Sequence, residues 1–298
     1  MRIGFIGIGL MGLPLCHRLL AAGHALTVWN RSPEKCRPLT DNGATVAASP
    51  AALAAASDLL LLCVSDTAAV EAVVFGTDGI AAGAHAGLLV ADHSSIAPSA
   101  TRALAARLRE ATGARWVDAP VSGGVIGAEQ GTLVIMAGGA ADDVARIHPV
   151  LACYSQRLTR MGDVGAGQVT KVCNQLVVAA NSLLIAETVA LAERAGVDAS
   201  LLAPALAGGF ADSLPFRILA PRMAERRFEP VQWKVQTLLK DLGNALALAR
   251  ESGGEVPLAS QAEALMRRHA ADGHAGADLS SVVLLHAAPA APPGGEAR

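Results

Sequence analysis

Two patterns of apolar residues divide the chain near residue 165. Before that point, short apolar runs alternate with stretches whose apolar residues recur every three or four positions. The strand-like runs lie at residues 2–6, 26–30, 58–64, 87–92, 116–118, 131–138 and 156–160. Beyond Gly167 the strand signal largely ends and the helical period prevails. The pattern predicts an α/β domain with a parallel sheet, followed by an all-α domain.

The helical half predicts one long first helix and several shorter ones. The expected helices span residues 168–194, 198–206, 214–225, 233–252, 257–271 and 278–286. We therefore expect domains at 1–162 and 163–286. The last segment, 287–298, is rich in Ala, Pro and Gly and is expected to be a disordered tail.

A glycine turn joins the first predicted strand to the first predicted helix. In GxGxxG, the first glycine permits a tight turn, the second lets a pyrophosphate approach the backbone, and the third lets the helix pack closely on the strand. The expected cofactor-binding residues of this turn are Gly7, Ile8, Gly9, Leu10, Met11 and Gly12. With a strand before it and a helix after it, this motif predicts a Rossmann dinucleotide-binding domain; the alternative is a merely structural turn.

The end of the second predicted strand bears on the choice between NAD and NADP. An NAD site tends to place Asp or Glu there, whereas this chain has Asn30, Arg31 and Ser32. A guanidinium attracts a 2′-phosphate and can bind it bidentately. We expect NADP to be preferred, with NAD still usable, because Glu34 is close by and Arg31 could instead be a solvated loop residue.

Two further strand ends are predicted to border the cofactor, because ligands of open α/β sheets bind outside the carboxyl ends of the strands. These ends supply Val64 and Ser65 after one strand, and Ser94 and Ser95 after the next. His93 precedes the two serines. A general-base role for His93 is the less favoured interpretation, since a loop histidine beside a ligand more often takes no part in the chemistry.

Ser122, Gly123 and Gly124 precede a predicted helical turn. Such a segment exposes backbone N–H groups and a hydroxyl, which can hold a carboxylate or an oxyanion. We expect it to bind substrate, and a flexible turn is the alternative.

The segment 165–175 runs from a glycine turn into the long helix at the predicted domain boundary. Lys171, Asn174 and Gln175 share one face of that helix, because residues three and four apart are helix neighbours. Two-domain enzymes often place clefts at such boundaries. Cys173 could be a catalytic thiol, but we favour Lys171 as the centre of the chemistry.

Charge and cysteine content exclude several other classes. The formal net charge of −2 gives no reason to expect a nucleic acid or an anionic membrane as partner. The five cysteines include no CxxC pair, so we expect free thiols in a reducing compartment and no metal site. No run of about 18 apolar residues and no signal peptide is evident, which makes a cytoplasmic location the expectation. Apolar helices in the second half suggest a homodimer or homotetramer.

Four motifs together resemble the β-hydroxyacid dehydrogenase family, the relatives of 3-hydroxyisobutyrate and 6-phosphogluconate dehydrogenases. They are GFIGIGLMG at 4–12, DAPVSGG at 118–124, GAGQVTKVCN at 165–174 and KDL at 240–242. The resemblance implies a Rossmann domain followed by an all-helical domain like the C-terminal domain of 6-phosphogluconate dehydrogenase. The lack of histidine in the KVCN run and the short chain argue against a phosphorylated sugar acid as substrate. Imine reductases share the architecture but usually replace the lysine, so its presence argues for a carbonyl substrate.

The resemblance also implies residue roles. Lys171 would be the general acid/base, and Asn174 would hold the substrate hydroxyl or the lysine. Gln175 would also bind the substrate. Ser122 to Gly124 would hold the substrate carboxylate, and Lys240 would reach the cofactor. The implied activity is NAD(P)H-dependent reduction of a short semialdehyde acid to a β-hydroxy acid.

The segments DHSSIAP (92–98) and ADGH (271–274) are similar to tartronate semialdehyde reductases, which convert tartronate semialdehyde to glycerate. VWNRS (28–32) instead resembles NADPH-dependent glyoxylate and succinic semialdehyde reductases. The reduction of tartronate semialdehyde to glycerate is the leading expectation. The alternatives are a glyoxylate or succinic semialdehyde reductase, a 3-hydroxyisobutyrate dehydrogenase, and a catalytically silent NADPH-binding module.

Overall fold

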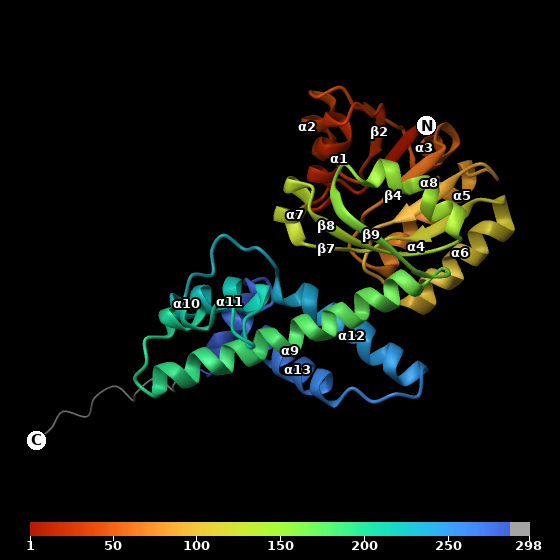
Figure 1. The fold of residues 1–298 in the computed structure, drawn as a ribbon. Coiled ribbons are helices and arrows are strands. Elements are labelled where there is room, and N and C mark those ends of the chain that lie inside the picture. The colour runs from red at the N-terminus through yellow and green to blue at the C-terminus, as the bar shows by residue number, and fades with distance from the viewer. Residues whose placement is uncertain (287–298) are drawn as a thin grey trace, which may run out of the picture. The chain divides into compact units, whose positions relative to one another are not determined.

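A computed structural model of the chain describes residues 1–286, and the tail expected at 287–298 lies outside the described residues. Two compact units meet within one long helix, between Cys173 and Asn174. The first unit is the α/β part and the second is helical (Figure 1). The fold is therefore a Rossmann-like domain followed by an all-α domain, as the sequence predicts.

The first unit is built on one nine-stranded sheet of order β3-β2-β1-β4-β5-β6-β8-β7, with β9 paired to β8. The strands are β1 (Ile3–Ile6), β2 (Leu26–Trp29), β3 (Thr45–Val46), β4 (Leu59–Leu62), β5 (Leu89–Asp92), β6 (Arg115–Asp118), β7 (Val121–Ser122), β8 (Leu133–Gly138) and β9 (Ser155–Gly162). The six strands β1 to β6 pair in parallel in the order 3-2-1-4-5-6, and the strand order reverses between β1 and β4. In sheets of this kind, the dinucleotide binds where the order reverses.

Helices cover both faces of the sheet, and alternate residues of each strand explain why. In β4, Leu59 and Leu61 join one apolar cluster while Leu60 and Leu62 join another. This is why buried parallel strands consist of continuous apolar runs. The helices of this unit are α1 (Gly12–Ala21), η1 (Pro33–Cys36), α2 (Arg37–Thr40), α3 (Pro50–Ala56), α4 (Thr67–Phe75), α5 (Ile80–Gly83), α6 (Pro98–Thr112), α7 (Gly124–Gln130) and α8 (Ala141–Leu151).

The second unit takes most of α9 (Ala166–Arg194) and packs the later helices around its own apolar cluster. Phe216, Leu238, Leu242 and Met266 lie in that cluster with residues of α9. The other elements are η2 (Ala199–Leu201), α10 (Leu202–Leu206), α11 (Leu214–Ala224), α12 (Val235–Glu251), α13 (Pro257–His269), η3 (Ala270–His274) and η4 (Leu279–His286). The helix expected at 278–286 is a 3-10 helix over Leu279–His286.

One expectation about apolar runs is corrected by α9. The helix has 29 residues and a mean hydropathy of 1.6 over its most apolar window, so by length and composition it meets the requirement for spanning a membrane. The run was missed because Asn181, Ser182 and Glu187 interrupt it. In the protein 44% of that window is buried, and α9 packs into the cluster of the second unit, as the core helix of a domain does.

Candidate active site

The turn between β1 and α1 has the geometry of a phosphate cradle. Gly7 has a φ of +101°, and an added Cβ there would collide with the carbonyl oxygen of Cys63. A Cβ on Gly12 would collide with the carbonyl oxygen of Gly7. A Cβ on Gly9 would meet nothing within 4 Å. No side chain caps the start of α1 at Met11. The turn therefore combines a tight backbone with an open helix N-terminus, which fits the pyrophosphate of a dinucleotide.

The end of β2 supports this turn through Asn30. Its side-chain oxygen accepts a hydrogen bond from the N–H of Ile8 (2.9 Å), and its amide nitrogen donates to the carbonyl oxygen of Ser32 (2.9 Å). Asn30 thus shapes the glycine turn, a role that the sequence pattern did not indicate. Arg31 is exposed and Ser32 half-buried. Their contact with a 2′-phosphate stays a prediction.

The loops after β4 and β5 are joined by Ser94. Its hydroxyl accepts a hydrogen bond from the N–H of Val64 (2.9 Å), and its own N–H donates to Asp92 (2.8 Å). Ser94 is only 1% exposed, so its hydroxyl holds the two loops together. Ser95 is half-buried and Ser65 exposed. A direct contact of Ser94 or Ser95 with the cofactor stays a prediction.

Two buried titratable groups lie at the end of β5. Burial raises the pKa of Asp92 to about 7, and one of its oxygens has no hydrogen-bond partner. Burial lowers the pKa of His93 to about 4. The two ring nitrogens of His93 contact the carbonyl oxygen of Ala119 (2.6 Å) and the hydroxyl of Tyr154 (2.9 Å). The buried, fully bonded ring favours the spectator role over the general base.

The predicted anion-binding segment sits at an edge of the sheet. Ser122 lies on β7, paired with Val134 of β8. Gly123 and Gly124 are exposed and have φ values of +129° and +63°, which favour glycine. No side chain caps α7 at Gly123. The segment has the exposed backbone that substrate binding requires, and the binding itself stays a prediction.

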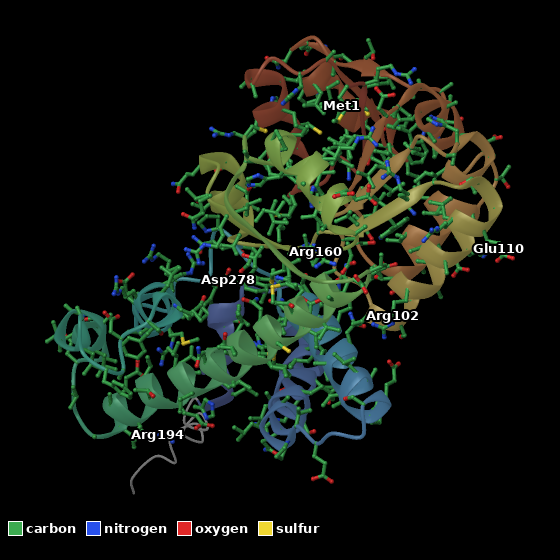
Figure 2. All side chains as sticks on the ribbon, turned by 45° about the vertical axis from the view of Figure 1, so that its right-hand side comes forward. Met1, Arg102, Glu110, Arg160, Arg194 and Asp278 are labelled. Carbon is green, nitrogen blue, oxygen red and sulfur yellow. The ribbon has the colours of Figure 1, made fainter. Side chains whose placement is uncertain are left out.

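The start of α9 is closed, in contrast to that of α1. The Asp118 carboxyl group accepts hydrogen bonds from the N–H groups of Gly165 (2.6 Å) and Gln168 (2.8 Å). Burial raises the pKa of Asp118, and these two donors lower it in part. A Cβ on Gly167 would collide with the carbonyl oxygen of Met136, and one on Gly165 would lie 2.8 Å from the guanidinium of Arg102, which is labelled in Figure 2. The first turn of α9 is thus seated directly on the sheet.

Gln168 fastens the same turn to the loop after β5. Its amide nitrogen donates to the carbonyl oxygen of Ser94 (2.7 Å), and its amide oxygen accepts from the N–H of Ile96 (3.3 Å). Lys171 follows one turn later and is only 7% exposed. The predicted acid/base therefore stands on a helix start that is fixed at two points. Gln168 and Asp118 lie within the sequence motifs, but the pattern gives them no role.

The second unit joins its predicted site residues in a chain of polar contacts. The Asn174 amide donates to the side-chain oxygen of Gln175 (2.7 Å), and the amide of Gln175 donates to Asp241 (2.5 Å). The ammonium of Lys240 lies 3.2 Å from the other oxygen of Asp241. Gln175 is fully buried and Lys240 half-buried. Asp241 is the central member that the sequence pattern left without a role.

Within residues 1–286, no cluster of His, Cys, Asp and Glu could hold a metal ion, and the five cysteines are free. The geometry of the first unit is that of a dinucleotide-binding domain with a fixed lysine beside it.

Comparisons with known proteins agree with this geometry. Residues 2–162 match the family model of the NAD-binding domain of 6-phosphogluconate dehydrogenase. Residues 165–286 match the NAD-binding domain of NADP-dependent 3-hydroxyisobutyrate dehydrogenase. The 2-hydroxy-3-oxopropionate reductase of Escherichia coli K12 is 37% identical over 95% of this chain and 96% of its own length.

Two solved structures share the whole architecture. The Mycobacterium tuberculosis 3-hydroxyisobutyrate dehydrogenase, solved with L-serine, is 31% identical, with a TM-score of 0.85 over 95% of this chain and 99% of its own. Psf3, solved with NADP+ and 2-OPP, is 26% identical, with a TM-score of 0.86 over 96% and 100% of the two chains.

These likenesses define the protein first as an NAD(P)-dependent oxidoreductase that acts on hydroxyl groups. The chain belongs to the β-hydroxyacid dehydrogenase family.

Proposed function

We propose that the protein reduces tartronate semialdehyde to glycerate and prefers NADPH as the reductant. The observation that supports the proposed proton transfer is the fixed position of Lys171. The substrate assignment is supported by the segments at 92–98 and 271–274 and by the likeness to the Escherichia coli 2-hydroxy-3-oxopropionate reductase.

When bound, a reduced nicotinamide would supply the hydride that reduces the aldehyde carbon. Lys171, as an ammonium, donates a proton to the carbonyl oxygen, so that the aldehyde becomes a hydroxyl. Ser122 and the backbone N–H groups at Gly123 and Gly124 hold the carboxylate of the substrate. Asn174 and Lys240 bind substrate and cofactor as the family resemblance implies. In the reverse direction, neutral Lys171 accepts the hydroxyl proton.

A substrate panel tests the assignment. Purified enzyme is supplied with NADPH, then with NADH, and with tartronate semialdehyde, succinic semialdehyde, glyoxylate or the semialdehyde of 3-hydroxyisobutyrate. We expect the highest kcat/KM with tartronate semialdehyde. A value at least tenfold higher with another substrate would replace the assignment with that specificity. The resemblance of Val28–Ser32 to glyoxylate and succinic semialdehyde reductases makes them the first alternatives.

The proposed preference for NADPH rests on Arg31, which is exposed at the end of β2 where no carboxylate occupies the ribose position. Arg31→Ala should raise the Kd of NADPH by about 10- to 100-fold, the value of one charge-assisted contact, and leave the Kd of NADH nearly unchanged. Arg37→Ala, an exposed arginine a few residues on, is the matched control. Equal losses for both cofactors would refute the 2′-phosphate role.

We further propose that a second copy of this chain covers an apolar stripe on α9. Val177, Leu184 and Leu191 are 61%, 62% and 68% exposed, and they recur every seven residues. That spacing lines them along one face for about 21 Å, and such a stripe can pair with its own copy about a two-fold axis.

Leu184→Glu should therefore lower the oligomeric state measured by analytical ultracentrifugation. Leu258→Glu changes another exposed leucine, outside α9, and serves as the control. A monomeric wild-type protein, or an unchanged Leu184→Glu assembly, would contradict the proposed interface. Binding of the wild type to lipid vesicles would assign the stripe to a membrane instead.

A further inference from the structure

The first turn of α9 contains a fully buried amide that the proposed mechanism does not use. Gln168 has no exposed surface, although an amide is costly to bury unless it is hydrogen-bonded. Apolar side chains would fill the same space without that cost. The position of Gln168 is therefore better explained by what its amide binds than by its volume.

Both ends of this amide bind the same loop. The nitrogen donates to the carbonyl oxygen of Ser94, and the oxygen accepts from the N–H of Ile96. The two contacts hold the peptide groups on either side of Ser95. Ser95 lies in the loop after β5, which the sheet topology places at the edge where the cofactor binds.

The backbone of the same residue is held from the other side. The N–H of Gln168 donates to Asp118 at the end of β6. β5 and β6 are adjacent strands, and Asp92 pairs with Asp118 in their register. Gln168 therefore connects two neighbouring strand ends and the helix, and Lys171 stands one turn further along.

We propose that Gln168 is a positioning residue, whose amide keeps the loop of Ser95 and the turn that bears Lys171 at one fixed separation. This inference rests on the proposed role of Lys171. A proton donor must lie within hydrogen-bond reach of the carbonyl oxygen while the hydride arrives, and a small misplacement slows such a step strongly. Loss of the two hydrogen bonds made by the Gln168 amide should therefore lower kcat more than it weakens cofactor binding.

Two substitutions separate positioning from packing. Gln168→Met keeps the size of the side chain and removes both hydrogen bonds. Gln168→Glu keeps the shape, but an ionised carboxylate cannot donate to the carbonyl oxygen of Ser94. Once protonated, it can donate again. Burial and the Asp118 carboxyl group, which accepts a hydrogen bond from the Gln168 N–H, favour the protonated form of such a glutamate.

The kinetic signature follows from this chemistry. Gln168→Met should lower kcat by about tenfold or more at every pH, with KM and the Kd of NADPH changed less than about threefold. The kcat of Gln168→Glu, divided by that of the wild type at the same pH, should rise as the pH falls. Thr170→Val, whose native hydroxyl donates back to the carbonyl oxygen of Ala166 within the same turn, should leave kcat unchanged.

A second measurement does not depend on turnover. Amide hydrogen exchange of residues 93–97 in the cofactor-free protein should be faster by about fivefold or more in Gln168→Met, the value of one net hydrogen bond, and near wild type in Thr170→Val. If Gln168→Met does not fold, the pH series of Gln168→Glu decides the question.

Three results would overturn the proposal. They are a wild-type kcat in Gln168→Met, a ratio for Gln168→Glu that does not vary with pH, and unchanged exchange at 93–97. A wild-type enzyme that turns over no carbonyl substrate would instead refute the proposed function. The exchange measurement would still test whether the Gln168 amide holds the loop of Ser95.

Discussion

Gly7–Gly12 and Gly165–Gly167 are both glycine turns that lead into a helix, but only the first leaves the helix start open. At α1, Gly9 faces free space and no side chain caps the first turn. At α9, Asp118 binds the first N–H groups and Gly167 leaves no room for another atom. The first turn can accept an anion from outside, and the second already holds the protein's own carboxyl group.

The two turns differ in where their anion comes from. Free N–H groups and the helix dipole attract any anion, whether it is a ligand or an aspartate from a neighbouring strand. In this protein the open start of α1 is the candidate binding site, whereas the closed start of α9 is an anchor. In this protein the anchor serves to fix the position of Lys171.

The largest effect should come from opening the closed turn. Asp118→Ala leaves the N–H groups of Gly165 and Gln168 without their buried acceptor. It should lower the free energy of unfolding by about 2 to 4 kcal/mol, measured by denaturant titration. Asp163→Ala, an exposed carboxylate in the same turn region, is the control. An Asp118→Ala protein as stable as the wild type would show that the carboxyl group does not anchor α9.

A smaller effect should come from blocking the open turn. Gly9→Ala adds a Cβ into free space, so the cofactor-free protein should keep the wild-type Tm. Because the pyrophosphate must approach the same backbone, the Kd values of NADPH and NADH should both rise by about tenfold. Gly276→Ala also adds a Cβ into free space and should change neither quantity. Unaltered cofactor affinity in Gly9→Ala would show that the open turn at α1 does not bind the pyrophosphate.

The smallest effect should come from Asp92, which lies beside the anchor. Burial raises the pKa of Asp92 from near 4, its value in the unfolded chain, to about 7 in the folded protein. The folded state thus holds an extra proton between these values, and this group's contribution to stability is lost as the pH rises from 4 to 7. His93, with its pKa lowered to about 4, acts in the opposite direction over a similar range.

Asp92→Asn isolates the first of these contributions. Relative to the wild type, the variant should gain about 1 kcal/mol, roughly 2–4 °C in Tm, on going from pH 6 to pH 7. The burial of the new amide shifts the Tm of the variant by the same amount at every pH, so it does not enter this difference. A Tm difference that does not change with pH would show that Asp92 ionises normally in the folded protein.

The sequence predicts those parts of the molecule that depend on local pattern. The apolar run 58–64 became β4, the glycine turn became the start of α1, and the helical period of 168–194 became α9. The short elements β3 and α2 were missed, because two to four residues carry too little periodicity to be recognised.

The polar contacts at the strand ends could not be predicted in the same way. Asp118 and Gln168 lie fifty residues apart in sequence, and Asn30 reaches Ile8 across 22 residues. Such pairs depend on how strands are ordered in the sheet, which no single stretch of sequence states. A general rule could have drawn attention to Gln168, because an amide predicted to be buried on a helix must find hydrogen-bond partners.

The most direct test of the account is a single-turnover measurement on Lys171→Ala. Wild type and variant are loaded with saturating NADPH and mixed with tartronate semialdehyde, and NADPH oxidation is followed in time. The Kd of NADPH is measured in parallel. We predict that the rate constant of the variant is lower by about 10²-fold or more while its Kd stays within about twofold of the wild type. An equal rate constant in the two proteins would contradict the role of Lys171 as proton donor.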